Sequence, residues 1–539
     1  MKNCKRLKDP IYGYIDVPIK YMTDIVDTSS FQRLRRIIQT SYSPLYSSAV
    51  HNRFVHSLGV YHLGVIAINA LKNELINMKI QHTDIDRACE LFLLACILHD
   101  VGHAPFSHTG EDLYLDSNNE CSSLHKKLIE MVDSDSFTED VPKEKSKAAA
   151  PHEIMSVLVA LKEYDEFFYN SYEKELFARC ITGYKHSDIT GENSINNCFI
   201  SLLNSKVIDV DKLDYLIRDA FITGFNTVTL DYNRLLTSIT IVEDNGKYEL
   251  SYYKSAISVI ENVVYAHDAE RKWIQSHPVV LYESYILQHI FKYLSTEVNE
   301  EGKNLFSLES LGKNGQVFKN SLHIKLMCDD DLIFLMKNIY PNDLSDEYFE
   351  RKNRRHPIWK SEAEYKAFFL KLCKAGTLLE EFENAMEKTA KYLIKSSDSW
   401  VINTKLINKI ENELKNLDTE GLDAKTVEIQ KKDKNYVLKI IKCLNNYAEE
   451  IGSECDFVIL MNSQFNSGFS KPDFSDTKIV FPTKDGREIA KFGDIASSFN
   501  AKAKDGDNFF YLFYKRIDNN NVDIDKNEIC RRLFLISNM

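Results

Sequence analysis

An uncharged apolar stretch that ends in a His-Asp pair is the feature that most constrains this chain. Residues 91–98 contain no charged side chain and predict a buried helix, which His99 and Asp100 follow directly. Gly102 and Pro105 then end the helix. A buried imidazole beside a buried carboxylate is costly unless both are compensated, and a metal ion compensates both. The alternative is a core histidine next to an ordinary aspartate, which is the commoner meaning of a lone His-Asp pair.

Two other segments carry the ligands that a metal site would need. His56 stands ahead of an apolar helix, and residues 209–219 contain four aspartates on a predicted helix with one apolar face. A ligand set of imidazoles and carboxylates is typical of a site for Mn²⁺, Fe²⁺, Zn²⁺ or Ni²⁺. It is not typical of a structural zinc site, which is rich in cysteine. An octahedral ion with four protein ligands keeps two positions for water and a phosphate oxygen. We therefore predict one divalent metal ion held by His56, His99, Asp100 and one of the aspartates in residues 209–219.

Further motifs extend the pattern beyond these four residues. In chain order they are Asp-Pro-Ile-Tyr-Gly-Tyr-Ile at 9–15, Phe-Gln-Arg-Leu-Arg-Arg-Ile at 31–37, His-Asn-Arg-Phe-Val-His-Ser-Leu-Gly-Val at 51–60, His-Asp-Val-Gly-His-Ala-Pro-Phe-Ser-His at 99–108 and Asp-Val-Asp-Lys-Leu-Asp-Tyr at 209–215. His56, His99, Asp100 and Asp211 match the H…HD…D signature of the HD phosphohydrolase superfamily, and this resemblance implies that Asp211 is the fourth metal ligand. The whole series resembles the deoxynucleoside triphosphate triphosphohydrolases, which include bacterial dGTPase-like enzymes and the mammalian dNTPase with an added SAM domain. The resemblance is specific through about Phe225 and weaker beyond it.

The resemblance implies a mainly α-helical fold, with an HD-domain metal-phosphohydrolase core, a helical extension and a small α+β C-terminal region. It implies hydrolysis of a dNTP to a deoxynucleoside and tripolyphosphate, with water attacking the α-phosphorus. The cofactor would be one Mn, Fe, Zn, Ni or Mg ion, and an additional Mg ion bound with the triphosphate is a further option. Because related enzymes assemble into oligomers, we expect a homo-oligomer of at least two chains.

Histidines that follow the metal pair are the candidate proton donors. By resemblance, His108 and His152 occupy the positions of catalytic or phosphate-facing histidines, with His103 and Glu111 beside them. An imidazole beside a phosphate can give a proton to the leaving oxygen. Glu111 stands where the mammalian enzyme has Asp, which could change the reach of a His–carboxylate pair. The alternative is that His103 and His108 only hydrogen-bond the Gly/Pro turn.

The same resemblance assigns contacts with the nucleotide. Arg53, Lys212 and Tyr215 map onto triphosphate-binding positions, and Asp219 maps onto one that contacts the sugar. Two further candidate substrate contacts are Gln39 and Arg271. Cationic side chains favour phosphate oxygens, and a tyrosine packed against the sugar would exclude a 2′-hydroxyl. Core packing is the alternative role of Tyr215. The helix around Arg271 departs from the family order and fits a plain amphipathic helix equally well.

A second nucleotide site is a further hypothesis. Asp27 and Arg35 match positions that bind an activating guanine nucleotide between subunits in the mammalian enzyme. Arg355, in the basic strip 351–355, could meet the phosphates of such an effector. A solvated charge run is the usual explanation of such a strip, so the effector site stays an open alternative.

Charge and cysteine usage limit the partners and the compartment. Lys+Arg 67 against Asp+Glu 79 gives a net charge of −12, which does not indicate general nucleic-acid binding, although it leaves room for a local basic channel. Eleven cysteines without a CxxC pair argue for reduced thiols in a cytoplasm. The N-terminus shows no signal-peptide apolar region, and no apolar span of about 20 residues stands out. We expect a cytoplasmic protein without a membrane segment.

The chain divides into four predicted regions. They are an N-terminal strand and helix segment (1–50), the HD core (51–295), a helical extension (296–453) and an α+β region (454–539). Within the core, residues 116–150 are polar and predict an exposed loop or a partly ordered insertion over the site.

Turn and periodicity signals place a few individual elements. Asn245-Gly246 predicts the turn of a β-hairpin. Residues 255–294 predict a long helix, and short apolar runs predict C-terminal strands at 457–461, 478–481 and 509–514.

Two other functions remain compatible with these residues. An HD phosphohydrolase could act on another nucleotide, such as a monophosphate, a cyclic nucleotide or an alarmone, and would then not release tripolyphosphate. A non-catalytic nucleotide sensor or nucleic-acid-binding protein could keep the fold for recognition alone. The complete set of metal ligands argues against this non-catalytic alternative.

Overall fold

In the computed structural model, the chain forms two compact units that interleave along the sequence. Unit 1 comprises Met1–Arg271, Leu294–Pro341 and Asn466–Ala503, and unit 2 comprises Lys272–Tyr293, Asn342–Phe465 and Lys504–Met539. These units are discontinuous in sequence, whereas the four predicted regions are consecutive. The structure describes residues 3–115, 122–142, 148–225, 229–351, 354–369, 372, 376–395, 402–416, 424–452, 455–462, 467–470, 472–484, 486–496, 509–516 and 524–537.

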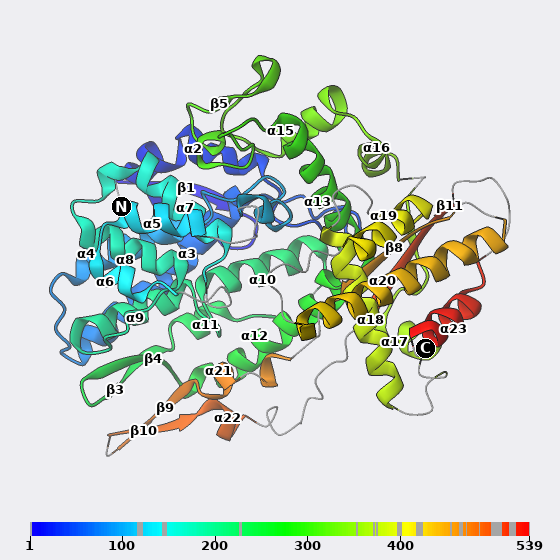
Figure 1. The fold of residues 1–539 in the computed structure, drawn as a ribbon. Coiled ribbons are helices and arrows are strands. Elements are labelled where there is room, and N and C mark those ends of the chain that lie inside the picture. The colour runs from blue at the N-terminus through cyan, green and yellow to red at the C-terminus, as the bar shows by residue number, and fades with distance from the viewer. Residues whose placement is uncertain are drawn as a thin grey trace. The chain divides into compact units, whose positions relative to one another are not determined.

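The core of unit 1 is a group of packed helices (Figure 1). They are α3 (Arg53–Asn77), α4 (Ile85–Leu98), α7 (Pro151–Glu163), α8 (Ser171–Thr182), α9 (Gly191–Leu203) and α10 (Val210–Thr223). The apolar stretch 91–98 lies in α4 and is buried apart from Leu93, which confirms the predicted helix. Helices α3 and α4 approach each other closely at Gly64, where an added Cβ would lie 2.7 Å from Sγ of Cys96.

Side-chain caps fix where three of these helices begin. Asn52 accepts a hydrogen bond from the backbone of Val55 at α3, and Asp84 accepts one from Arg87 at α4. Asp209 accepts a 2.7 Å bond from the backbone N–H of Lys212 at α10. Each cap satisfies an amide that has no partner within its helix, so the starts of α3 and α10 and their first side chains are well defined.

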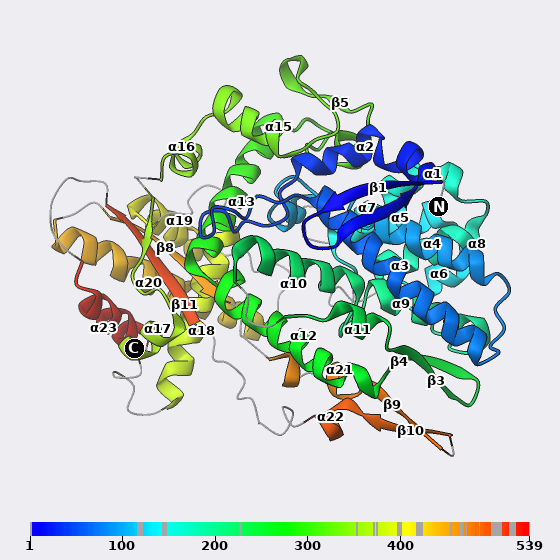
Figure 2. The ribbon, with the colours of Figure 1, turned by 180° about the vertical axis from the view of Figure 1, so that it is seen from behind.

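Two strand groups complete unit 1. β1 (Cys4–Asp9) pairs antiparallel with β2 (Gly13–Pro18), where the sequence predicts a strand or turn. β3 (Ile239–Asp244) and β4 (Lys247–Tyr253) form the predicted hairpin, and the positive φ of Asn245 (53°) and Gly246 (77°) is what its tight turn requires. The C-terminal strands β9 (Lys478–Thr483) and β10 (Gly486–Lys491) extend this sheet in the order β10-β9-β4-β3, side by side in Figures 1 and 2.

The polar insertion is more ordered than expected. Its described parts contain α5 (Ser122–Val132) and α6 (Asp135–Asp140) rather than an exposed loop. Phe137 is fully buried, and the buried guanidinium of Arg179 on α8 binds Asp140 at 2.8 Å. Of the two predicted alternatives, the exposed loop is wrong for these residues, because a buried arginine needs a carboxylate partner and Asp140 on α6 provides it. Residues 116–121 and 143–147 lie outside the described part of the chain.

The predicted long helix over 255–294 is interrupted. α12 (Ile257–Glu270) is followed by a π-helical turn at Arg271–Gln275, and α13 (Pro278–Val298) begins at a proline. Proline suits a first helical turn, because its missing N–H would have no partner there. The remaining elements of unit 1 are short: α1 (Ile19–Tyr21), α2 (Ser29–Gln32), α11 (Tyr232–Leu236), α14 (Leu308–Leu311), β5 (Gln316–Val317), β6 (His323–Ile324), α15 (Asp329–Phe334), α21 (Pro472–Ser475) and α22 (Phe492–Ile495).

Unit 2 combines a small sheet with helices. Its strands β7 (His356–Pro357), β11 (Phe509–Arg516) and β8 (Cys455–Asn462) have the order β7-β11-β8. Its further helices are α16 (Asp343–Phe349), α17 (Glu362–Phe369), α18 (Gly376–Lys395), α19 (Thr404–Lys415), α20 (Ala424–Glu450) and α23 (Lys526–Ser537). All three predicted C-terminal strands are therefore present, but they belong to two separate sheets.

Helix α3 is long and apolar enough to cross a membrane by length and composition, with a mean hydropathy of 1.5 in its most apolar window. By this measure, the expectation that the chain has no such span is wrong. However, 67% of that window is buried within the protein, where α3 packs against α4 and α10. Burial of this kind is typical of a core helix, which is apolar on most sides because protein surrounds it.

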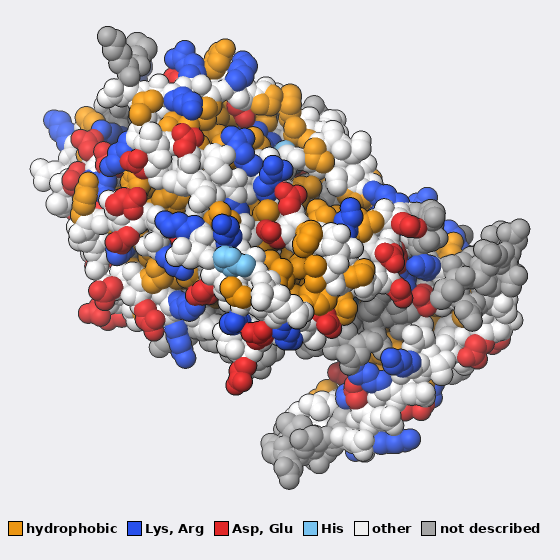
Figure 3. Space-filling model, turned by 90° about the horizontal axis from the view of Figure 1, so that it is seen from above, with side chains coloured by type: hydrophobic (Ala, Val, Ile, Leu, Met, Phe, Trp, Pro, Cys, Tyr) orange, Lys and Arg blue, Asp and Glu red, His pale blue; other side chains and the backbone are white. Residues whose placement is uncertain are grey.

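The surface mixes charges of both signs. On the face shown in Figure 3, basic and acidic side chains are interspersed among the described residues. This pattern agrees with a chain whose net charge of −12 is the small difference between many positive and negative groups.

The joint between β4 and β9 gives a stability prediction. Ile479 on β9 is fully buried, so Ile479→Ala should lower the free energy of unfolding of unit 1 by about 2–5 kcal/mol. Ile489 on the neighbouring β10 is 50% exposed and serves as the matched control, with an expected change below about 0.5 kcal/mol for Ile489→Ala. Thermal and urea unfolding of both variants measures the difference. Equal effects would contradict a buried role of β9.

Candidate metal centre and active site

Four side chains from three helical segments converge in unit 1. They are His56 in α3, His99 and Asp100 directly after α4, and Asp211 in the first turn of α10. Nε2 of His56 lies 3.3 Å from Nε2 of His99 and 2.9 Å from Oδ1 of Asp211. Asp100 joins them, with Oδ1 3.4 Å from Nε2 of His99 and Oδ2 3.6 Å from Nε2 of His56. The structure thus brings together all four residues that the sequence predicts as metal ligands.

These spacings fit a shared divalent ion. Neighbouring ligand atoms on an octahedral ion with bonds of about 2.1 Å lie about 3 Å apart. The distances that join Nε2 of His56 and Nε2 of His99 to each other and to the two carboxylates range from 2.9 to 3.6 Å, close to that value. Two imidazole nitrogens 3.3 Å apart also need a proton or a cation between them. The donor set of imidazole nitrogens and carboxylate oxygens therefore suits a divalent metal.

Charge within this group is unusually concentrated. Burial lowers the pKa of His56, but Asp211 and Asp214 outweigh it and raise the pKa to about 10. Burial would raise the pKa of Asp100, but the positive charges of Arg53 and His99 hold it well below its ordinary value. Asp211 shows the same direction of shift, because the two histidines outweigh its burial. A cation can take the place of the proton that otherwise binds among these carboxylates.

A second layer of residues holds His56 in place. Its Nδ1 lies 2.7 Å from Oδ2 of Asp214, which is fully buried one turn after Asp211 on α10. Tyr12 donates a 2.7 Å hydrogen bond to Asp214, and Arg218 binds the same carboxylate through Nε and Nη2 at 2.9 and 3.0 Å. Arg218 also contacts Asp9 at 3.1 Å. A carboxylate on the far nitrogen of a ligand histidine fixes its orientation and its tautomer.

This layer requires a glycine on α3. A Cβ added at Gly59 would lie 1.8 Å from Oδ1 of Asp214 and 2.5 Å from Nη2 of Arg218. The missing side chain therefore lets the buried ion pair reach the helix that carries His56.

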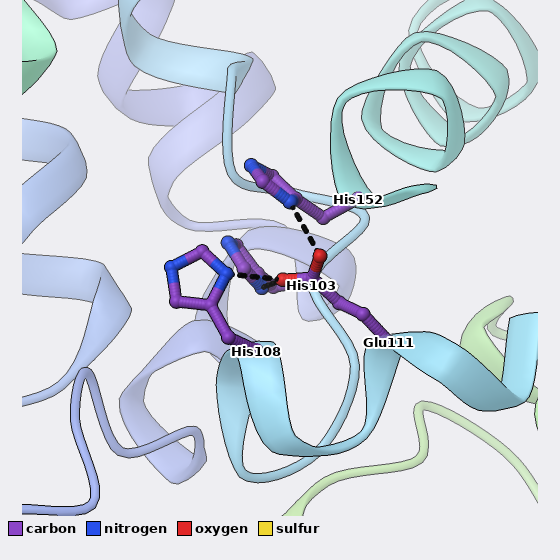
Figure 4. A group of neighbouring side chains, drawn as sticks. All are labelled: His103, His108, Glu111 and His152. Carbon is purple, nitrogen blue, oxygen red and sulfur yellow. Dashed lines mark hydrogen bonds and ion pairs between the residues drawn. The ribbon is translucent and has the colours of Figure 1, made fainter. Parts of the chain in front are cut away.

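The second group contains the four candidate catalytic residues (Figure 4). Glu111 lies between the imidazoles, with Oε1 2.6 Å from Nδ1 of His108 and Oε2 2.9 Å from Nδ1 of His152. His103 stacks on His152 with ring centroids 4.2 Å apart, and its Nε2 is 3.3 Å from Oδ1 of Asp100. His103 therefore connects this group to the metal ligands. The longer side chain of Glu111, compared with Asp, reaches both His108 and His152.

The protonation of this group follows from its contacts. Burial lowers the pKa of His152, but the negative charge of Glu111 outweighs it and raises the pKa to about 9. Burial would raise the pKa of Glu111, but His152 and His108 keep it well below its ordinary value. The pKa of His103 lies well below its usual range because of burial and the nearby charges of Arg53 and His152. The group therefore combines a protonated His152 with an ionised Glu111.

The loop after α4 brings the two groups together. Gly102 packs against the backbone of α7, since a Cβ there would lie 2.3 Å from the backbone of Met155 and Ser156. Phe106 and Ser107 both have positive φ, 57° and 54°, and Ser107 is the first residue of the 3₁₀ turn that carries His108. Such backbone conformations are strained for residues other than glycine and are found where the surroundings impose them.

Two of the predicted substrate contacts adjoin the metal ligands. The buried guanidinium of Arg53 binds Oδ2 of Asp100 and Oγ of Ser107, each at 2.9 Å. It also donates a 3.3 Å bond to the carbonyl of Gln39. The side-chain Oε1 of Gln39 is buried without a hydrogen-bond partner among the described residues. An unsatisfied acceptor in this position suits a ligand hydroxyl or amide.

The other predicted substrate contacts already have protein partners or lie farther along the chain. Nζ of Lys212 binds Oδ2 of Asp209 at 2.6 Å, and Asp219 lies 2.7 Å from Nε2 of His51. Tyr215 is partly buried on α10, one turn after Asp211. Arg271 is partly exposed in the π-helical turn that follows α12. The assignments of all four to substrate stay predictions.

The three effector candidates lie in different settings. Asp27 and Arg35 are exposed in unit 1, and the guanidinium of Arg35 stacks on the ring of Phe54 at 3.5 Å. Arg355 belongs to unit 2, where it is buried and binds Glu347 and Asp456. The effector role of these residues stays a prediction.

Several supporting residues were not identified from the sequence. Asp214 sits three positions after Asp211, a spacing that places both on one face of α10, and this signal could have found it. Asp9 and Tyr12 lie in a recognised motif, but nothing local to residues 9–15 indicates that they meet α10. Their roles depend on packing between distant segments.

Comparison with known proteins agrees with this geometry. Residues 53–169 match the family model described as the HD domain. Residues 53–169 are therefore an HD domain. The matched HD domain contains His56, His99 and Asp100, together with all four residues of the second group.

Individual relatives cover different parts of the chain. An uncharacterized protein of Mycoplasma genitalium, MG461, is 28% identical over 339 residues, which span 61% of this chain and 70% of that protein. A protein of Dictyostelium discoideum named as a homolog of the deoxynucleoside triphosphate triphosphohydrolase SAMHD1 is 28% identical over 281 residues, 49% of this chain and 46% of that protein. A Bacteroides thetaiotaomicron phosphohydrolase structure covers 95% of this chain and 99% of that one, with a TM-score of 0.53 at 18% identity, which supports the fold alone.

The layer behind His56 gives a prediction about metal affinity in the HD domain. Asp214→Asn keeps the shape of the side chain but removes the charge that orients His56, so we expect metal affinity to fall about 10- to 100-fold. Asp86→Asn is the matched control, because Asp86 forms an exposed pair with Lys72 away from the metal ligands and should leave affinity unchanged. Metal titration followed by elemental analysis measures both variants. Wild-type affinity in Asp214→Asn would show that the contact does not support the metal centre.

Proposed function

We propose that this HD-domain phosphohydrolase is a metal-dependent dNTP triphosphohydrolase. The observation that supports the proposal most is the convergence of His56, His99, Asp100 and Asp211 beside a second group that holds a protonated histidine. The first group can hold a divalent cation, and the second can supply a proton. Hydrolysis of a phosphate ester needs both functions at the same phosphorus.

The proposed reaction consumes one water and breaks one bond. The water oxygen attacks the α-phosphorus, the bond between that phosphorus and O5′ breaks, and tripolyphosphate and the deoxynucleoside separate. O5′ receives a proton from a histidine paired with Glu111, either His152 or His108. Arg53 and Lys212 provide positive charge for the phosphate chain. A divalent ion held by the four ligands would withdraw charge from the phosphate and lower the pKa of bound water.

The choice of dNTP rests on the relatives and on the resemblance of the motifs. Proteins named as SAMHD1 or its homologs match at 25% to 30% identity, but the alignments cover only 37% to 54% of their lengths. The substrate and any effector nucleotide or oligomeric assembly therefore belong to the proposal. Hydrolysis of another nucleotide is the second candidate, since the metal ligands and histidines would serve that reaction equally well.

One chromatographic assay tests the proposal. The purified protein is incubated with each of the four dNTPs and with Mn²⁺ or Mg²⁺, in the presence and absence of GTP. Tripolyphosphate and deoxynucleoside are the expected products. Release of orthophosphate or pyrophosphate instead would favour another phosphohydrolase activity, and metal-dependent nucleotide binding without turnover would favour a sensor.

The pKa of His152 leads to a pH prediction. A histidine that donates a proton must be protonated, so activity should fall as the pH rises through about 9 in the wild type. Glu111→Gln removes the charge that raises this pKa and leaves the burial that lowers it. The basic limb of kcat/KM should then move below about pH 7. Asp112→Asn, at an exposed neighbouring position, is the control that should keep the limb near pH 9. An unmoved limb in Glu111→Gln would exclude this pair as the proton donor.

Tyr215 leads to a prediction about sugar selectivity. It lies one helical turn after Asp211, so its ring can face the same pocket and crowd a 2′-hydroxyl. Tyr215→Ala should raise the ratio of GTP to dGTP hydrolysis about 5- to 150-fold, equivalent to ~1–3 kcal/mol of relieved crowding. Phe221→Ala, at a 52% exposed position of the same helix, should leave the ratio unchanged. Measurement of kcat/KM for both nucleotides decides, and equal ratios would leave Tyr215 as core packing.

A further inference from the structure

A buried carboxylate joins two segments that carry active-site residues. Asp329, the first residue of α15, is 8% exposed. Its Oδ1 accepts a 2.6 Å hydrogen bond from the backbone N–H of Phe106, in the loop between His103 and His108. Its Oδ2 accepts a 2.8 Å bond from the backbone N–H of Ile38, next to Gln39. Each oxygen of one carboxylate thus holds a different segment.

The amide of Phe106 is held in a strained part of the chain. Phe106 and Ser107 have consecutive positive φ values of 57° and 54°. Each such residue is strained, so the conformation persists only when surrounding contacts impose it. The hydrogen bond from Phe106 to Asp329 is one of these contacts.

Arg33 holds the same loop through its carbonyl groups. This arginine is 5% exposed and donates to the carbonyls of Val101 at 2.8 Å and His103 at 3.0 Å. It donates a third bond, 2.7 Å long, to the carbonyl of Met327, two residues before Asp329. Burial raises the pKa of Asp329 to about 7, so this group holds the loop through the hydrogen bond that its Oδ1 accepts. The guanidinium of Arg33 on the carbonyls and the carboxyl group of Asp329 on an amide thus hold one loop, and both connect it to the segment that begins α15.

The two segments that Asp329 binds both contact Arg53. Oγ of Ser107 donates to the carbonyl of Ile38 and accepts a bond from Nε of Arg53. The backbone N–H of Arg53 in turn donates a 3.0 Å bond to the carbonyl of Ile37. Residues 37–39 bind the segment before α3 a second time, because the backbone N–H of Gln39 donates a 2.9 Å bond to the carbonyl of His51. Arg53 therefore lies where both segments meet.

We propose that Asp329 is a positioning residue. It holds residues 37–39 in place against the loop formed by residues 101–108, and so positions Arg53 and His108 relative to each other. This inference rests on the proposed function, because it assigns these two residues to the reaction. Asp329 does not belong to either group of reactive side chains. It acts through the backbone amides of Ile38 and Phe106.

The test compares two neighbouring aspartates. Asn at position 329 keeps the shape of Asp but has one acceptor oxygen, so its amide N–H would face the N–H of Ile38 or Phe106. Asp329→Asn should lower kcat about 10- to 100-fold with metal content unchanged, since small misplacements of reacting groups have effects of this size. Asp330→Asn is the matched control, because Asp330 is exposed and pairs with the exposed Arg36 at 3.5 Å. The control should stay within about twofold of wild type.

Two readouts separate positioning from a general loss of stability. Hydrogen exchange in peptides covering residues 37–39 and 101–108 should accelerate in Asp329→Asn, while exchange in α8 and α9 stays at the wild-type rate. In a double-mutant cycle, Asp329→Asn and Ser107→Ala should have less than additive effects on kcat/KM, because both loosen the same joint. Wild-type kcat together with unchanged exchange in residues 101–108 would overturn the proposal, as would fully additive effects.

The experiment also distinguishes this inference from the proposed function. Activity is measured with dGTP and with bis(p-nitrophenyl) phosphate, a general phosphodiester probe. If the wild type cleaves only the probe, the dNTP assignment fails, and the comparison of Asp329→Asn with Asp330→Asn is still decided on the probe and by exchange. If Asp329→Asn does not fold, Arg33→Lys answers the same question against the exposed control Arg36→Lys. A lysine cannot bind three carbonyls in the fixed geometry of the guanidinium, so the same losses are expected.

Discussion

The contact between His56 and Asp214 is the interaction on which the metal centre depends. His56 is fully buried, and its two ring nitrogens lie within 2.9 Å of carboxylates on the same helix, α10. Asp214 fixes the ring from behind while Asp211 faces the other nitrogen. Because these aspartates are three residues apart, one face of one helix supplies both. The buried pair with Arg218 then compensates the charge of Asp214, without which that carboxylate would be costly to bury.

Close packing makes this arrangement specific. Gly59 leaves room for Asp214 against α3, Gly64 lets α3 approach α4, and Gly102 lets the loop after α4 lie on the backbone of α7. These three approaches align the helices whose ends carry His56, His99 and His152. The reactive side chains come from segments that only tertiary packing brings together, so a change at one of these glycines would act on the chemistry through the spacing of helices.

Local signals explain how much was predictable from the sequence. The buried helix before His99, the Asn245-Gly246 turn and the C-terminal strands each depend on a few adjacent residues, and all are present. The four metal candidates lie close together, and their role as ligands stays a prediction. For the polar insertion the sequence left an exposed loop and a partly ordered insertion open, because its helices depend on a buried arginine far along the chain. Asp329 gave no signal at all, because its partner Phe106 is 223 residues away and contributes only a backbone amide.

The cations around the site determine what an anionic substrate would meet under the proposed function. Arg53 binds Asp100, and Lys212 binds Asp209, so each already has a carboxylate partner. When a triphosphate binds, each cation would therefore exchange its carboxylate partner for a phosphate. The free energy gained on binding is the difference between these two interactions. Such pairing also holds each side chain in one place before a ligand arrives, which reduces the ordering that binding requires. Under the proposed function, the site would therefore bind the triphosphate less tightly but in a preorganised geometry. The hydrogen bonds that hold residues 101–108 in one conformation have the same effect on the histidines.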